Sequence, residues 1–411
     1  MEVESMTPDN VARPASMDAV LDYAWGAREF TATDVIENIE VTRSTAISAM
    51  DALVELGLLR ELPNARDAGQ YRMGRPARRF AFQSDAGVVV GVDAGHTHLA
   101  VTVADLAGEV MHRLRRELDP QNDSPAERRT EIGDAVDAAL QSAGRGRDDL
   151  VAVCVGVPAP VDKHGRSPRH PDGFWARMNP DLADAFGPWA PLVRIENDAS
   201  LAAVAEGSIG AAVGCSDYVA LLAGQRFGAG VVVDGSLLRG RHGGVGEMIA
   251  FDHVMGVETA EGLGHQISGW ARSAVEDGSI APSSALGSIP ADELDARRVL
   301  ELAAAGDADA RKLADRAGQM LARVVSVLGS MFDPQRVVVT GAVADGIAVA
   351  VDKARDALPT DLDLPVPELV VSSLGADVVV EGALHAAVDL ARERALDLFL
   401  ASRSQNEAAT L

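Results

Sequence analysis

The segment VTRSTAISAMDALVELGLL, residues 41–59, has the pattern of a single amphipathic helix with both ends marked. Thr42 is of a type that commonly caps a helix N-terminus, and Gly57 stands where such a helix would end. Several apolar residues recur at helical spacing and predict a buried stripe. They are Ala46, Ala49 or Met50, and Leu53.

The flanking segments predict further elements of the same small domain. Residues 17–25 have helical spacing of apolar positions, and residues 31–39 open with cap-competent threonines. After a predicted strand at residues 58–62 and a loop rich in proline and glycine, ARRFAF at residues 77–82 alternates as a second strand. Three helices followed by a basic hairpin predict a winged helix-turn-helix, which we assign to residues 1–85.

Charge supports a local DNA contact rather than bulk attraction to nucleic acid. The net charge of −24 repels phosphate, yet residues 60–80 hold six arginines against Glu61 and Asp67, a local net charge of +4. Ile47 lies off the buried stripe and could touch a thymine methyl or pack against a neighbour. A solvated arginine-rich turn is the alternative for the hairpin. The predicted DNA contacts are Arg43, Ser44, Thr45, Ser48, Arg72, Arg75 and Arg78.

A resemblance to a known family becomes specific at this point. RSTAISAMDALVELGLLRE, followed by GRPARRFAFQSDAG and VVVGVDAGHTHLAVTVADLAGE, resembles the N-terminal half of regulators in the ROK family, named for repressors, open reading frames and kinases. The similarity covers nearly the whole chain. It implies an α/β fold in which the winged helix precedes a two-lobed sugar-kinase-like domain of the actin and hexokinase type, residues 86–411.

The two phosphate motifs of this family are only partly matched. Residues 93–97, DAGHT, resemble the first motif, with histidines at 96 and 98 replacing the usual glycine and lysine, although a plain strand turn explains the segment equally well. In the second motif, GQRFGAG at residues 224–230, Gln225 replaces a threonine and Arg226 a glycine. Arg226 could bind phosphate as a cation, but we expect it to fill or block the nucleotide side. The vestigial nucleotide site comprises Asp93, Gly95, Thr97, Gly228 and Gly230.

The sugar side is also incomplete by resemblance. Asp198 matches the family's catalytic base, although it could merely cap the helix that follows it. Ala250 stands where active kinases have a histidine that binds sugar and zinc, and no cysteine follows Cys215, so we expect neither a metal nor a cofactor. The predicted effector-binding residues are Asn197, Asp198, Glu247 and Glu258.

Three hypotheses for function follow. The favoured one is a DNA-binding transcriptional regulator, a repressor, whose non-catalytic body binds a sugar-type effector and forms a homodimer or homotetramer on a double-stranded DNA operator. The alternatives are a working ATP-dependent carbohydrate kinase with an added DNA-binding domain, and an effector-free dimerisation scaffold. The sequence has no apolar run of about 18 residues and no leader pattern, which predicts a cytoplasmic protein without a membrane partner.

Overall fold

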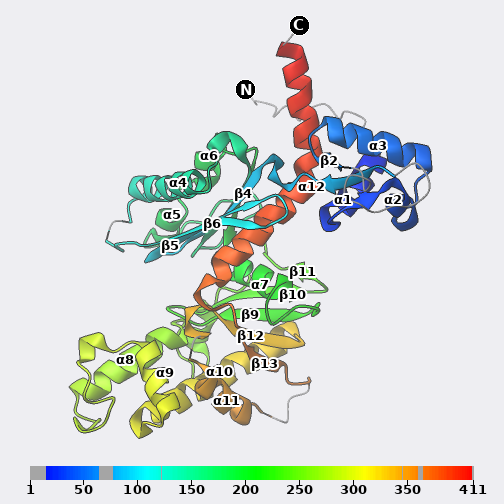
Figure 1. The fold of residues 1–411 in the computed structure, drawn as a ribbon. Helices are drawn as coiled ribbons and strands as arrows, with labels where there is room; N and C mark the ends of the chain where they lie inside the picture. Colours follow the sequence, from blue (N-terminus) through cyan, green and yellow to red (C-terminus); the bar gives the residue numbers. More distant parts are fainter. Residues whose placement is uncertain (1–14, 64–76, 122, 345, 360–363, 410–411) are drawn as a thin grey trace. The chain divides into compact units, whose positions relative to one another are not determined.

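The computed structural model describes residues 15–63, 77–121, 123–344, 346–359 and 364–409 (Figure 1). Contacts between residues divide the chain into two compact units. The first comprises residues 1–89, 104–109 and 388–411, and the second comprises residues 90–103 and 110–387. The boundary that the sequence predicts, between residues 85 and 86, stays a prediction. Two predicted DNA contacts, Arg72 and Arg75, lie outside the described residues.

The first unit contains a winged helix. Its helices are α1 (Ala15–Gly26), α2 (Ala32–Asn38) and α3 (Arg43–Glu55). Its strands are β1 (Phe30–Thr31), β2 (Leu59–Leu62) and β3 (Arg79–Phe82), in the spatial order β1-β3-β2. The predicted helices and hairpin are thus present, whereas the sequence analysis missed β1, because two residues are too few to show an alternating pattern.

Local capping chemistry explains where these helices begin. Thr31 and Asp34 form a reciprocal capping box at α2. The Thr42 hydroxyl accepts a hydrogen bond from the amide of Thr45 at 3.3 Å, as its predicted capping role requires. Gly57 has a φ of +76°, a conformation that glycine adopts without strain, and the chain turns there into β2.

The long C-terminal helix α12 (Val378–Ala409) contributes its last part to the first unit. Arg392 donates to the Asp22 carboxylate of α1 at 2.9 Å, and Arg403 pairs with Glu55 of α3 at 3.1 Å. The final turns of α12 are therefore tied by charge to two helices of the winged helix.

The second unit contains two five-stranded sheets among the described residues. The first has the order β6-β5-β4-β7-β8, from β4 (Val88–Ala94), β5 (His98–Asp105), β6 (Val110–Glu117), β7 (Leu150–Val157) and β8 (Leu192–Asn197). The second has the order β11-β10-β9-β12-β13, from β9 (Tyr218–Leu222), β10 (Gly228–Val233), β11 (Ser236–Leu237), β12 (Arg336–Thr340) and β13 (Glu368–Val371). Strand β4 is buried along its whole length, as expected of a central strand.

Helices cover these sheets. With the first sheet come α4 (Pro125–Ser142), α5 (Phe174–Met178) and α6 (Leu182–Phe186). Helix α7 (Asp198–Ser208) lies against β9 and β10 (Figure 1). The later helices are α8 (Leu263–Glu276), α9 (Ala296–Ala305), α10 (Ala308–Phe332) and α11 (Ala348–Ala357). Short 3-10 turns lie at Ser84–Ala86, Arg147–Asp149, Ile249–His253, Ala291–Glu293, Ala342–Ala344 and Gly375–Asp377.

Helix α10 has the buried face that its sequence spacing predicts. Ala317, Leu321, Val324 and Leu328 are buried, and Leu313 is half-buried. They join the apolar core that surrounds the second sheet. Among the described residues no helix is both long enough and apolar enough to cross a membrane.

Candidate functional site

The junction of β8 and α7 positions the predicted effector residues Asn197 and Asp198. The Asn197 side-chain oxygen accepts a hydrogen bond from the amide of Ser200 at 3.1 Å, so Asn197 is the N-cap of α7. Its amide nitrogen donates to the carbonyl of Ala159 at 3.2 Å and to Asp198 at 3.1 Å. The alternative that Asp198 itself caps the helix is therefore wrong, and Asp198 is the first residue inside α7.

Asp198 is a half-buried acid with an altered affinity for protons. Burial raises its pKa to about 7, and the charges of Asp93 and Glu247 act in the same direction. A hydrogen bond from the amide of Ala199, at 2.8 Å, partly offsets this effect. A carboxyl with a raised pKa can accept a hydrogen bond from a ligand hydroxyl when ionised and donate one when protonated.

Two residues of the first phosphate motif lie beside Asp198. Asp93 is 4% exposed, and its Oδ2 lies 2.8 Å from His98 Nε2. This hydrogen bond raises the pKa of His98 against the opposing effect of burial, and the charge of Asp198 adds to the rise. We call Asp93, His98, Asn197, Asp198 and Glu247 the Asp198 cluster.

His98 also covers the glycine of this motif. A Cβ atom placed on Gly95 would lie 2.4 Å from Cε1 of His98, so the imidazole ring rests directly on the Gly95 backbone. Strand β4 extends to Ala94, which leaves only residues 95–97 for the turn, and Thr97 is exposed. The imidazole of His98 therefore fills the space next to the Gly95 backbone.

A buried arginine that the sequence analysis missed holds the same turn. Arg128, on α4, is 3% exposed and donates to the carbonyls of Ala94, Gly95 and Met178, the last at 3.0 Å. Burial lowers its pKa to about 10. The available signal was its place one helical turn before the buried Ile132, where a charged residue is unusual.

The loop predicted as the second phosphate motif is joined by hydrogen bonds to residues 260–262. The amide of Phe227 donates to the carbonyl of Ala260 at 2.9 Å, and the amide of Gly262 donates to the carbonyl of Gln225 at 2.9 Å. Arg226 forms an ion pair with Glu261 at 3.2 Å. The loop thus satisfies part of its backbone internally, and its arginine is paired with a carboxylate of the same chain.

Two glycines of the predicted nucleotide site have a packing role. A Cβ on Gly230 would lie 2.2 Å from the carbonyl oxygen of Ala199 and 2.5 Å from Cβ of Ala203. A Cβ on Gly228 would lie 3.3 Å from Cβ of Ala199. The absence of side chains here lets α7 press against β10, a sufficient reason for both glycines without any nucleotide.

The remaining two carboxylates differ in their placement. Glu247 forms a β-bridge with Gly228, and burial raises its pKa while Arg226 and His170 lower it. Glu258 is exposed, with a φ of +55°, and within the described residues no hydrogen bond or ion pair joins its carboxylate to the Asp198 cluster. The structure brings Asn197, Asp198 and Glu247 together, and the role of Glu258 stays a prediction.

Helix α3 presents the predicted major-groove residues. Arg43, Ser44, Ile47 and Ser48 are exposed, whereas Thr45 is half-buried. The exposure of Ile47 agrees with its position off the buried stripe. No acid lies in the first turn of α3, so its N-terminus carries no negative side chain that would repel phosphate.

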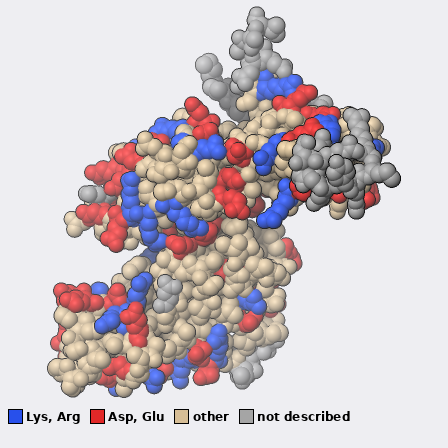
Figure 2. Space-filling view, viewed as in Figure 1, with Lys and Arg blue, Asp and Glu red and all other residues tan. Residues whose placement is uncertain are grey.

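Arg78 is committed to partners inside the winged helix. It donates to Asp51 of α3 at 2.7 Å and to Glu61 of β2 at 2.8 Å, and these hydrogen bonds raise its pKa. Arg78 therefore ties the base of the hairpin to α3, and a DNA contact would require it to exchange these partners. On the face drawn in Figure 2, basic and acidic side chains are interspersed rather than segregated.

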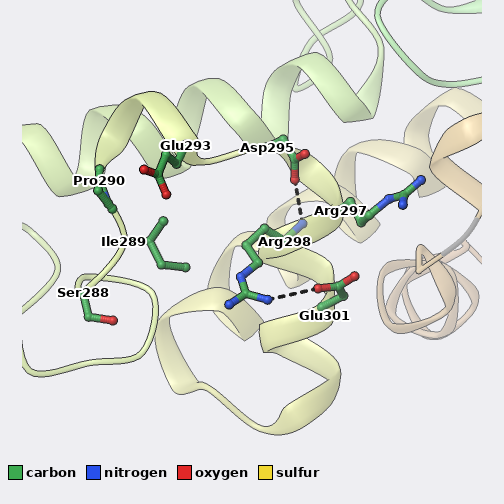
Figure 3. A pocket seen from close by; sticks show the side chains of 8 residues that line it. All are labelled: Ser288, Ile289, Pro290, Glu293, Asp295, Arg297, Arg298 and Glu301. Carbon is green, nitrogen blue, oxygen red and sulfur yellow. Dashed lines mark hydrogen bonds and ion pairs between the residues drawn. The ribbon is translucent and has the colours of Figure 1, made fainter.

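A surface pocket of about 480 Å³ lies apart from all the predicted site residues (Figure 3). It is lined by Ser288, Ile289, Pro290, Glu293, Asp295, Arg297, Arg298 and Glu301. Asp295 caps α9 by accepting from the Arg298 amide at 2.7 Å, and Arg298 pairs with Glu301 at 3.4 Å. Arg297 extends away from the other labelled side chains (Figure 3). Three of the polar side chains thus take part in capping or ion pairing within α9, and we assign no ligand to this pocket.

The protonation of the Asp198 cluster should make stability depend on pH. The folded-state pKa of Asp198, about 7, lies above its ordinary value of 3.8, so the native state loses stability as pH rises through this interval. The raised pKa of His98 acts in the same sense, because its stabilising contribution is lost as pH rises through the folded value. As the pH rises from about 5 to about 8, we expect the melting temperature of Asp198→Asn to fall less than that of the wild type.

Thermal denaturation at several pH values measures this difference. Asp356→Asn, at an exposed position on α11, is the matched control and should keep the wild-type dependence. Parallel pH profiles for Asp198→Asn and the wild type would show that Asp198 does not have the raised pKa described above.

Comparison with known proteins shows which family the chain belongs to. A family model described as ROK family matches residues 89–392. The chain belongs to the ROK family. It is 22% identical to the DNA-binding transcriptional dual regulator NagC of Escherichia coli (strain K12), across 92% of this chain and 97% of NagC. It is 32% identical over 224 residues to the bifunctional enzyme NanE/NanK of Brucella suis, and this match spans only 39% of that enzyme.

Solved structures of this ROK protein's relatives agree with the fold. A ROK family transcriptional regulator, a homologue of the E. coli MLC protein, superposes with a TM-score of 0.70 at 18% identity and covers 92% of this chain and 96% of that one. A ROK family glucokinase from Streptomyces griseus, in complex with glucose and AMPPNP, gives a TM-score of 0.60 at 26% identity, with 73% of this chain and 99% of that one covered. The predicted fold class, a winged helix-turn-helix followed by a two-lobed body, is confirmed.

Proposed function

We propose that this ROK protein is a DNA-binding transcriptional regulator, a repressor, whose body binds a sugar-type effector and does not phosphorylate it. The observation that carries the proposal is the winged helix, with an exposed α3 face, in a chain that matches NagC over 92% of its length. A kinase has no need of such a domain. The glucokinase likeness, by contrast, covers 73% of this chain.

The exposed face of α3 supports DNA as the partner. Arg43, Ser44 and Ser48 offer hydrogen-bond donors at the start of a capped helix, as major-groove readers do. One winged helix reads a half-site, so we propose that a homodimer or homotetramer reads a palindromic operator. Arg72 and Arg75 remain proposed hairpin contacts.

The Asp198 cluster supports a sugar-type effector. Carboxylates that retain exposed surface, beside the asparagine that caps α7, can receive the hydroxyl groups of a sugar. The names of two relatives, the N-acetylglucosamine repressor of E. coli O157:H7 and the xylose repressor of Caldicellulosiruptor bescii, suggest the first sugars to examine.

Three features of the body argue against phosphoryl transfer. His98 rests on Gly95, the Phe227 amide is bonded to Ala260, and Arg226 is paired with Glu261. Phosphoryl transfer depends on positioning and charge stabilisation, so a suitable base alone contributes little. Asp198, with its pKa of about 7, is the one observation that favours the second candidate, an ATP-dependent carbohydrate kinase.

Selection of DNA by the full chain tests the proposed function. The purified protein should enrich a small set of fragments from its own genome, and retention of an enriched fragment should change when N-acetylglucosamine, glucose or xylose is added. Failure to prefer any fragment over random DNA would contradict the regulator. Specific binding without any response to the sugars would favour the effector-free scaffold.

We expect no useful kinase activity. With magnesium, ATP and a panel of hexoses, N-acetylhexosamines and pentoses, ADP release should not depend on the sugar, because both phosphate motifs are occupied by the chain itself. The double change Gln225→Thr with Arg226→Gly should not restore activity, since His98 still covers Gly95. Sugar-dependent turnover near about 1 per second, lost in Asp198→Asn, would overturn the non-catalytic assignment.

A further inference from the structure

One loop of the second unit contacts segments of both sheets. It follows β11 and comprises residues 239–247, and we call it the 239–247 loop. At its end, the amide of Ala229, in β10, donates to the carbonyl of Gly246 at 3.1 Å, and Glu247 forms a β-bridge with Gly228. The end of the loop is therefore held on the second sheet.

The middle of the 239–247 loop rests on a segment that follows the first sheet. Gly243 is buried and has a φ of +71°, a conformation that favours glycine. A Cβ atom placed on it would lie 2.0 Å from the carbonyl oxygen of Val161, four residues after the end of β7. The two main chains are thus in direct contact, and no side chain fits between them.

An ion pair fastens the start of the 239–247 loop to the first sheet. Nε and Nη2 of Arg239 each lie 2.8 Å from Oε2 of Glu196, in β8. The other carboxylate oxygen of Glu196 accepts a hydrogen bond from the amide of Asn197 at 3.3 Å. The Glu196 side chain is 5% exposed and that of Arg239 is 38% exposed. A buried carboxylate that loses its cation is strongly destabilised, so this pair holds the loop more firmly than an exposed pair would.

The anchors of the 239–247 loop lie next to the proposed effector residues. Glu196 directly precedes Asn197, and Glu247 is the last residue of the loop. A Cβ atom on Gly228, the β-bridge partner of Glu247, would lie 3.3 Å from Cβ of Ala199, the residue after Asp198. Gly228 thus contacts both Glu247 and the first turn of α7.

We infer that Arg239 is a positioning residue for the proposed effector site. Its ion pair with Glu196 fastens the 239–247 loop to β8 and so fixes Glu247 in relation to Asn197 and Asp198 before a sugar binds. The inference rests on the proposed effector site and adds a residue that acts on it through Glu196 rather than by touching the sugar. A group that is held in place before the ligand arrives loses less entropy on binding, so release of the loop lowers the affinity.

Titration of the full chain with N-acetylglucosamine, glucose and xylose tests the inference. For a sugar that binds the wild type, Arg239→Ala should raise Kd about tenfold, which corresponds to about 1.4 kcal/mol. Arg239→Lys keeps a cation for Glu196 and should restore Kd to within about threefold of the wild type. Arg241→Ala, an exposed change in the same loop, is the matched control and should keep the wild-type Kd.

A double-mutant cycle shows whether Arg239 acts through Glu196. Glu196→Gln removes the buried charge and should itself raise Kd, and adding Arg239→Ala to it should raise Kd little further. The double variant leaves no unpaired buried carboxylate, so it takes the place of Arg239→Ala if that variant does not fold. Kd increases that multiply in the double variant would show that Arg239 acts independently of Glu196, contrary to the inference.

Hydrogen exchange in the sugar-free protein measures the placement of the loop directly. The amide of Ala229, which bonds the loop at Gly246, should exchange faster in Arg239→Ala, or in the double variant that replaces it, than in the wild type and in Arg241→Ala. Wild-type Kd or wild-type exchange at this amide would overturn the inference while leaving the effector site intact. No binding of any of the three sugars by the wild type would overturn the effector site itself, and the inference with it.

Discussion

Gly230→Ala should lower the free energy of unfolding by about 3 kcal/mol. The new Cβ atom would lie 2.2 Å from the carbonyl oxygen of Ala199 and 2.5 Å from Cβ of Ala203, and neither a backbone oxygen nor a helix Cβ can swing aside. Helix α7 must therefore shift away from β10. Because Asp198 is the first residue of α7, sugar binding should weaken as well.

Gly224→Ala, in the loop that precedes β10, is the matched control. A Cβ at Gly224 meets no atom within 4 Å, so this change should be neutral or stabilise by about 0.5 kcal/mol through the unfolded chain. Chemical denaturation of both variants measures the difference. Equal stability of Gly230→Ala and Gly224→Ala would mean that packing does not require a glycine at position 230, which would favour a nucleotide-binding role for Gly230.

Arg43→Ala should weaken specific DNA binding by about 1 to 3 kcal/mol without unfolding the protein. Arg43 is the first residue of α3 and is exposed, so it is free to contact a phosphate or a base edge. Binding is measured on a fragment selected by the full chain, at fixed salt, since phosphate contacts are screened by ions.

Arg297→Ala, an exposed change in the second unit, should bind that fragment as the wild type does.

Arg78→Ala tests whether Arg78 positions the hairpin or contacts the DNA directly. It frees the hairpin from Asp51 and Glu61, so any loss of DNA binding should come with greater mobility of the hairpin base, visible as faster hydrogen exchange in β3. Wild-type affinity in Arg43→Ala would remove α3 from the proposed interface.

The winged helix could be predicted because its signals are local. Thr42 and Gly57 mark the ends of α3 by capping and backbone chemistry that involve only near neighbours in sequence. The buried stripe followed from the period of the helix. Strand β1 could not be predicted, because its identity depends on pairing Phe30 with Phe80, fifty residues away.

The candidate site was predicted in its residues but not in its contacts. Family resemblance predicted Asn197, Asp198 and Glu247 as effector residues, and the structure brings the three close to one another, while their role stays a prediction. It could not show that Asn197 caps α7, or that Arg128 holds the turn after β4 from a distant helix. The same residue types would have given the same family resemblance whether Asn197 or Asp198 capped α7, and with or without Arg128 at the turn.

The sequence by itself determined the helices and the hairpin of the winged helix and the residue types at the two predicted phosphate motifs, since these depend on residue type and near neighbours. Only the tertiary structure decided which contacts the residues of these motifs make. His98 covers Gly95, Arg226 is paired with Glu261, and the lack of a side chain at Gly230 lets α7 pack on β10. The Arg226–Glu261 pair and the packing of α7 on Gly230 depend on atoms that segments separated along the chain bring within a few ångströms of one another, and a linear pattern does not encode such distances.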